Sequence, residues 1–127
     1  QILRKIASSK MATTPVSLNI GGKVYTTSAK TLTRYPSSIL GSDEMVQMYE
    51  TGIVPFLDRD PDLFAHILDF LRTEAPFSEY IPPPETYTCL RLIKEAKSYK
   101  LVEMVSLLEA YHREQEKQKA ASAASGL

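Results

Sequence analysis

The stretch of sequence that decides the fold reads Phe56-Leu57-Asp58-Arg59-Asp60-Pro61-Asp62-Leu63-Phe64-Ala65-His66-Ile67-Leu68-Asp69-Phe70-Leu71-Arg72. It begins as a short apolar strand, breaks at a charged turn and continues as a strongly amphipathic helix. Pro61 suits the first helical position because its φ is fixed and it has no N–H. Asp60 is then expected to cap the helix. The apolar residues at helical spacing form a stripe that the rest of the fold must cover: Leu63, Phe64, Ile67, Leu68, Phe70 and Leu71.

The composition is that of an ordinary globular domain. The 127 residues are 43% apolar and 24% charged, and 15 basic residues balance 15 acidic ones. A nucleic-acid binder would carry a basic surplus, so the balance argues against one. No apolar run reaches the roughly 20 residues that span a bilayer, and no signal peptide is recognisable. The sequence therefore predicts a cytoplasmic domain without direct membrane insertion.

Three strands are expected. Apolar and polar residues alternate over 16–20, and Gly21-Gly22 supplies the positive φ angles of a two-residue hairpin turn. The chain then returns as a second strand over 23–28, rich in β-branched and aromatic residues. A third strand is expected over 53–57.

Short helices are expected between the second and third strands. Ser28 can cap one of them, and Ser37 or Ser38 can cap another that ends at Leu40. The segment 44–50 is expected to form a further helical turn or a long loop.

Two helices are expected after a proline-rich loop over 73–85. Thr86 can cap the first of them, with Leu90, Ile93 and Ala96 directed inward, and a break follows over 98–100. The predicted class is α/β (α+β), with a small three-stranded sheet covered by a cluster of α-helices.

The chain is expected to hold one domain with loose ends. Residues 1–14 are interpreted as a disordered or tag-derived segment, because Met11 would make a natural start. The domain itself is expected over 15–111. Residues 112–127 are interpreted as an exposed helical or disordered tail, since they are too polar to build a core.

A few residues could in principle carry catalytic or metal chemistry. Asp58 and Asp60 could hold a cation or act as acid and base, but no glycine-rich phosphate loop accompanies them. His66 and Cys89 could form a nucleophile pair, but no orienting residue is evident. Cys89 is also the only cysteine, so a zinc cluster would lack ligands. We predict that the chain is not an enzyme and that it binds no metal or cofactor.

Several short motifs follow one another in a fixed order. They are Val16–Gly22, Tyr25–Ser28, Thr31–Gly41, Phe56–Pro61, Phe64, Ile67–Thr73, and Glu95-Ala96 with Tyr99. Together they resemble the BTB/POZ domain of the potassium-channel tetramerisation type, found in KCTD proteins and in voltage-gated potassium channels. The resemblance covers about residues 15–111, and the sequence of Phe56–Pro61 is more similar to that of KCTD proteins than to that of channels.

The resemblance implies a cytosolic domain that closes into a ring of four or five copies through largely polar faces. A ring requires each copy to present two different faces to its neighbours. The residues that the resemblance assigns to this interface are Asn19, Lys23, Asp58, Arg59 and Asp60. Some channel domains join their subunits through a zinc site rich in cysteine, which Cys89 alone cannot supply.

The resemblance also implies a partner. Many KCTD proteins resemble substrate adaptors of cullin-3 ubiquitin ligases, and cullin-binding BTB domains carry a hydrophobic–x–Glu motif before the third strand. Here Met48-Tyr49-Glu50 occupies that region. The cullin-binding candidates are Met45, Met48, Tyr49, Glu50 and Tyr87; alternatively, the two methionines pack beneath the short helix.

The expected function is protein–protein interaction: a homo-oligomeric ring that serves as a substrate adaptor for cullin-3. The alternative is an oligomerisation scaffold of a potassium channel, or of a regulator associated with a channel or receptor, without a role in ubiquitination. In either case the client would be bound by regions outside this domain.

Overall fold

The computed structural model describes residues 13–74 and 79–125, and every structural statement below concerns these residues. The predicted segment 1–14 therefore lies outside them except for Thr13 and Thr14. The elements in chain order are β1 (Pro15–Ile20), β2 (Lys23–Ser28), α2 (Ala29–Leu32), α3 (Asp43–Thr51), β3 (Phe56–Leu57), α4 (Pro61–Arg72), α5 (Thr86–Ser98) and α6 (Val102–Ser125). The predicted class, a small sheet with several helices, is confirmed.

The sheet has the strand order β2-β1-β3, with β1 antiparallel to β2 and parallel to β3. Gly21 and Gly22 turn the hairpin with φ angles of 58° and 104°. A Cβ at position 21 would collide with the carbonyl oxygen of Arg59, so the glycine also lets two loops meet. The third strand is shorter than predicted: residues 53–55 are not strand, although the Pro55 carbonyl accepts the Asn19 N–H at 2.8 Å.

Helix α4 forms as the sequence predicts. Asp60 caps it by accepting the N–H groups of Asp62 and Leu63 at 2.8 and 3.3 Å, and Pro61 occupies the first position. All six residues of the predicted stripe are buried. The helix is thereby fixed to the sheet, where the Tyr25 ring meets Phe64 edge-on at 5.0 Å.

The predicted helix over 37–40 is wrong. These residues form a series of turns after Pro36. Buried Ser38 holds them: its hydroxyl donates to the Tyr35 carbonyl at 2.7 Å and accepts the Gly41 N–H at 3.3 Å. Local hydrogen bonds of this kind compete with helix formation.

Helix α3 begins after this turn and is longer than the predicted segment 44–50. The Ser42 hydroxyl caps it by accepting the Met45 N–H. Gly52 ends it in a left-handed conformation with a φ of 78°, which glycine adopts without strain.

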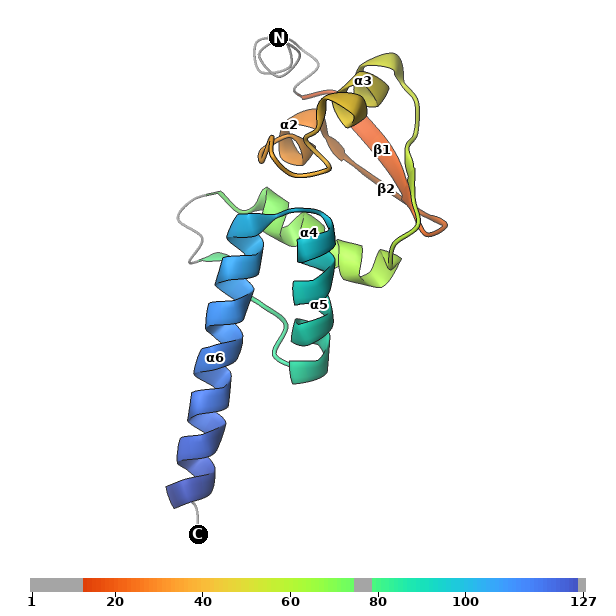
Figure 1. Ribbon diagram of the computed structural model, residues 1–127. Helices are drawn as coiled ribbons and strands as arrows, with labels where there is room; N and C mark the ends of the chain where they lie inside the picture. The colour runs from red at the N-terminus through yellow and green to blue at the C-terminus, as the bar shows by residue number, and fades with distance from the viewer. Residues whose placement is uncertain (1–12, 75–78, 126–127) are drawn as a thin grey trace.

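Helices α5 and α6 run antiparallel beside each other, and α6 extends well past the rest of the fold (Figure 1). Thr86 is not the cap of α5 but its first residue, and its hydroxyl accepts Lys119 Nζ at 2.6 Å. Leu90 was predicted to face inward, but 46% of it is exposed, whereas Leu92 is buried. The predicted break over 98–100 is confirmed. No helix among residues 13–74 and 79–125 is long and apolar enough to cross a membrane.

Candidate protein-interaction sites

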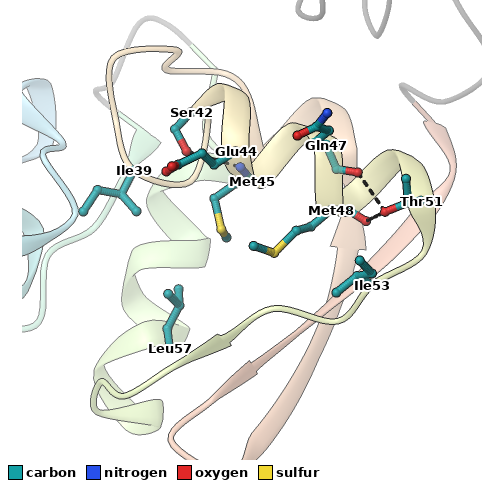
Figure 2. Close-up of a pocket in the computed structure, with 9 residues that line it drawn as sticks. All are labelled: Ile39, Ser42, Glu44, Met45, Gln47, Met48, Thr51, Ile53 and Leu57. Atoms are coloured by element: carbon teal, nitrogen blue, oxygen red, sulfur yellow. Dashed lines mark hydrogen bonds between the residues drawn. The ribbon is translucent and has the colours of Figure 1, made fainter.

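A groove of about 660 Å³ opens between α3 and the segment that leads into β3. Figure 2 shows Met45 and Met48 projecting from α3 toward that segment, with Leu57 and Ile53 on its side. We call this the α3 groove, and its apolar lining residues are Ile39, Met45, Met48, Ile53 and Leu57. A concave, mostly apolar surface of this kind suits an apolar side chain of a partner.

The core holds α3 in place behind this groove. Tyr49 is buried, and its hydroxyl donates to the Leu40 carbonyl at 2.8 Å. Burial raises the pKa of this hydroxyl, so it stays protonated and remains a donor. Only 6% of Met45 is exposed, whereas Met48 is half-buried. Met48 is thus more exposed than Met45 and Tyr49, and Tyr49 supports the helix from inside.

The structure separates Met48 from Glu50. Glu50 lines a neighbouring cleft of about 320 Å³ between the end of α3 and the start of β1, on which Met48 does not lie. Ile53, 58% exposed, lines both hollows. A partner that contacted both Met48 and Glu50 would therefore have to pass over Ile53.

Tyr87 lies apart from the α3 groove. It is the second residue of α5, where 72% of it is exposed and the centre of its ring lies 5.6 Å from the Arg91 guanidinium carbon. Both residues line a polar hollow together with Asp58, Arg59 and Asp60. The structure therefore places this cullin-binding candidate among the oligomer candidates.

The turn Asp58–Asp60 is tied to α5 of the same chain by two ion pairs. Arg59 contacts Glu95 through Nη2 at 2.7 Å and through Nε at 3.1 Å. Asp60 contacts Arg91 at 2.6 Å. The hydrogen bond from Arg59 to Glu95 outweighs desolvation and raises the pKa of Arg59. The predicted interface residues Arg59 and Asp60 thus have partners within their own chain, while Asp58 stays exposed.

Burial and hydrogen bonds shift the pKa of Asp60 in opposite directions. Desolvation raises its pKa, but the N–H groups of Leu63 and Asp62 and the Arg91 side chain outweigh it, so the pKa of Asp60 is lowered. The carboxylate therefore remains ionised as both helix cap and ion-pair partner.

The hairpin lies directly beside this turn. The Gly21 N–H donates to the Leu57 carbonyl at 2.8 Å, and Asn19 Oδ1 accepts the Gly22 N–H at 2.8 Å. Lys23 Nζ lies 5.1 Å from the centre of the Tyr25 ring. The structure thus brings the two predicted interface segments, the hairpin and the charged turn, together on one side of the domain.

Cys89 is the candidate nucleophile that the sequence offers. Cys89 is buried, and burial raises its thiol pKa, which opposes formation of a thiolate. Within residues 13–74 and 79–125 no group of three or more His, Cys, Asp or Glu side chains could hold a metal ion.

Sequence reasoning missed several residues of these sites. Ile39 and Ile53 join the α3 groove from outside the helix, and no local pattern indicates this. Arg91 and Glu95 are the partners of the charged turn; their spacing of four on one helix was the available signal.

Comparison with known proteins agrees with this architecture. Residues 16–108 match the BTB/POZ domain family. The human protein called potassium channel regulatory protein is 43% identical over 101 residues, which cover 76% of this chain and 35% of that protein. Human BTB/POZ domain-containing protein KCTD21 is 37% identical over 99 residues, covering 75% of this chain and 36% of that protein. The chain thus spans about a third of the length of these curated relatives. The chain belongs to the BTB/POZ family, of the potassium-channel tetramerisation type, whose domains mediate protein–protein interaction and oligomerisation.

Proposed function

We propose that residues 15–111 form a cytoplasmic, non-enzymatic adaptor domain that assembles into a ring of four or five copies and binds cullin-3. In this proposal each copy presents its α3 groove to the N-terminal region of cullin-3. The rest of the protein, or a segment beyond residue 111, holds the client.

The α3 groove is the observation that carries the proposal. It combines apolar lining from α3 with an exposed isoleucine at its border, and it lies where the resemblance expects the partner. Methionine side chains are flexible and polarisable, so Met48 can adapt to an apolar residue of the partner. Glu50, on the neighbouring cleft, supplies an acid within reach of the same interface.

Calorimetry with the purified cullin-3 N-terminal region tests the proposal. We expect binding that Met48→Asp and Ile53→Asp each weaken by about tenfold or more, because each places a charge at the centre of an apolar contact. Val102→Asp is the matched control. Val102 is 65% exposed on α6, away from the groove, and this substitution adds the same charge as the other two. Absence of binding by the wild type, or equal binding by all three variants, would overturn the proposal.

A scaffold without a ligase role is the second candidate, and the name of the human relative that is 43% identical, potassium channel regulatory protein, favours it. In this case the domain associates with the tetramerisation domain of a potassium channel. Mixing the two domains and measuring the mass of the complexes by light scattering separates the two candidate functions. A scaffold forms mixed oligomers with the channel domain and does not bind cullin-3.

A further inference from the structure

Two neighbouring serines in the turn after Pro36 have opposite environments. Ser38 is 2% exposed, and its hydroxyl is bonded to the Tyr35 carbonyl and the Gly41 N–H. Ser37 is exposed, as is Pro36 before it, and its hydroxyl makes no hydrogen bond among residues 13–74 and 79–125. A serine on an exposed turn with a free hydroxyl is accessible to a modifying enzyme. Ser37 therefore meets the first requirement of a modification site, and Ser38 does not.

Ser37 borders a hollow of about 420 Å³ at the junction of α5 and α6. The loop between α2 and α3 reaches this junction, where the Ile39 N–H donates to the Tyr99 carbonyl at 2.9 Å (Figure 1). Two lysines line the hollow, Lys97 and Lys100, and none of its lining residues in the described part of the chain is acidic. The other lining residues are uncharged: Leu101, Val102, Val105 and Ser106. The hollow thus presents two positive charges on a chain whose charges balance overall.

Both ammonium groups can receive an anion. Lys100 is exposed and makes no ion pair within 4 Å among the described residues. Lys97 pairs with Glu109 at 3.4 Å, but these side chains are 60% and 41% exposed, and exposed pairs of this kind contribute little. A phosphate monoester carries nearly two negative charges, so it competes well with the single carboxylate of Glu109 for Lys97.

The backbone of Lys100 has a conformation that lysine rarely adopts. Its φ of 61° makes it the one residue other than glycine with a positive φ in the described part of the chain. Its N–H donates to the Lys97 carbonyl at 3.0 Å, so the two lysines are joined through the backbone. Conformations of this kind cluster at functional sites, where the position of a side chain outweighs the strain. The conformation of Lys100 therefore favours a role for this side chain at the hollow.

We propose that Ser37 is a phosphorylation site and that Lys97 and Lys100 bind the phosphate, which ties the turn to the junction of α5 and α6. A protein kinase transfers the terminal phosphoryl group of a nucleoside triphosphate to this serine. The Ser37 Oγ forms the new bond to phosphorus, the bond from phosphorus to the bridging oxygen breaks, and nucleoside diphosphate leaves. The hydroxyl proton passes to a base of the kinase. Charge-assisted hydrogen bonds from the two ammonium groups then hold the phosphate. This proposal goes beyond the proposed function and depends on neither the ring nor cullin-3.

Urea denaturation of the whole chain with phosphoserine encoded at position 37 tests the binding of the phosphate. We expect the phosphate to lower the unfolding equilibrium constant about fivefold relative to the unmodified chain. The same comparison in a chain with Lys97→Gln and Lys100→Gln should show no such change, since the cycle isolates the contact with the lysines. An unchanged equilibrium constant, or a decrease that persists without the two lysines, would overturn the proposal.

Phosphoserine at Ser122 is the matched control. Ser122 is exposed on α6 and does not line the hollow. Its phosphate should therefore have the same effect on unfolding with and without the two lysines. An effect at Ser122 that depends on Lys97 and Lys100 as strongly as the effect at Ser37 would mean that the lysines act at long range, and would overturn their role as the binding site.

Inorganic phosphate separates a bound free anion from a modification. Added to the unmodified chain at millimolar concentration, it should lower the unfolding equilibrium constant equally with and without the two lysines. A stabilisation as large as that of phosphoserine 37, and lost with the lysines, would assign the hollow to a free anion and overturn the role of Ser37.

Mass spectrometry of the protein isolated from its own cells locates the modification. We expect phosphate on Ser37 and none on Ser38, because the Ser38 hydroxyl is buried and bonded within the turn. An unmodified Ser37, or a phosphate on Ser38 in its place, would overturn the assignment.

Discussion

Arg59 and Glu95 form a two-point ion pair that joins the turn after β3 to helix α5, with contacts of 2.7 and 3.1 Å. The two side chains are 34% and 13% exposed, so the pair is partly shielded from solvent. The parallel geometry of the guanidinium and carboxylate strengthens such a pair and fixes its orientation. Arg59 therefore stabilises its own chain, whatever its neighbour contributes.

Arg59→Glu is expected to lower the free energy of unfolding by about 2 kcal/mol, because it places two carboxylates together in a partly buried site. The double variant Arg59→Glu with Glu95→Arg should recover part of this loss. Urea denaturation at fixed protein concentration measures both. The resemblance assigned Arg59 to the contact between copies, and its pair with Glu95 gives it a role in the stability of its own chain as well.

Asp58→Lys is the control within the same turn. Asp58 is exposed and makes no ion pair within 4 Å among the described residues, so this change should alter stability by no more than about 0.5 kcal/mol. Equal losses for Asp58→Lys and Arg59→Glu would contradict the role given to the ion pair.

Asp60 makes stability depend on pH. Its pKa in the folded chain lies below the value of about 4 expected for the unfolded chain, so the folded state holds fewer protons in that range. The stability it contributes is full above pH 4 and is lost as the pH falls through the lowered pKa. We expect Asp60→Asn to be less stable than the wild type at neutral pH and to lose less on acidification.

Denaturation curves at a series of pH values down to the acid transition measure this effect. Asp69→Asn, at an exposed aspartate of the same helix, is the control and should keep the wild-type dependence. An Asp60→Asn curve parallel to that of the wild type would show that Asp60 does not carry the effect.

Features that neighbouring residues determine were predicted correctly from the sequence, whereas features that depend on residues far apart in the chain were not. Helix α4 was predicted with its cap, its proline and every buried residue, because those signals lie within one segment. The prediction failed at residues 37–40 for two reasons. Ser38 bonds within its own loop, and the Ile39 N–H donates to the distant Tyr99 carbonyl at 2.9 Å, which holds the loop in turns.

The interaction sites were harder to predict for the same reason. The sequence placed Met48 and Glu50 in one motif, but the helix turns them into different hollows. It did not indicate that Glu95 would pair with Arg59, 36 positions away. Nor did it reveal that Ser37 shares a hollow with Lys97 and Lys100, which lie far from it in the chain.

Two buried tyrosines make a matched pair for the value of a hydrogen bond. The Tyr49 hydroxyl donates to the Leu40 carbonyl, whereas the Tyr99 hydroxyl has no hydrogen-bond partner among the described residues. Tyr49→Phe leaves a buried carbonyl unpaired and should cost about 1–2 kcal/mol of unfolding free energy. Tyr99→Phe removes only a buried polar group and should be neutral or stabilising by up to about 1 kcal/mol. Urea denaturation compares them directly, and an equal loss for both would contradict this reasoning.

Lys100 ends helix α5 in a left-handed conformation with a φ of 61°, which costs a residue with a side chain more than it costs glycine. Its N–H donates to the Lys97 carbonyl, and the following N–H of Leu101 donates to Ala96, both at 3.0 Å, so the backbone bonds fix this conformation. Lys100→Gly keeps these bonds and relieves the strain. It is expected to raise the unfolding free energy by up to about 1 kcal/mol.

Lys94→Gly is the control for Lys100→Gly. Lys94 is exposed within the same helix, where glycine should lower the unfolding free energy by about 1 kcal/mol. Thermal melts of the two variants should therefore shift in opposite directions, and a lower melting temperature for both would show that the conformation of Lys100 is not strained.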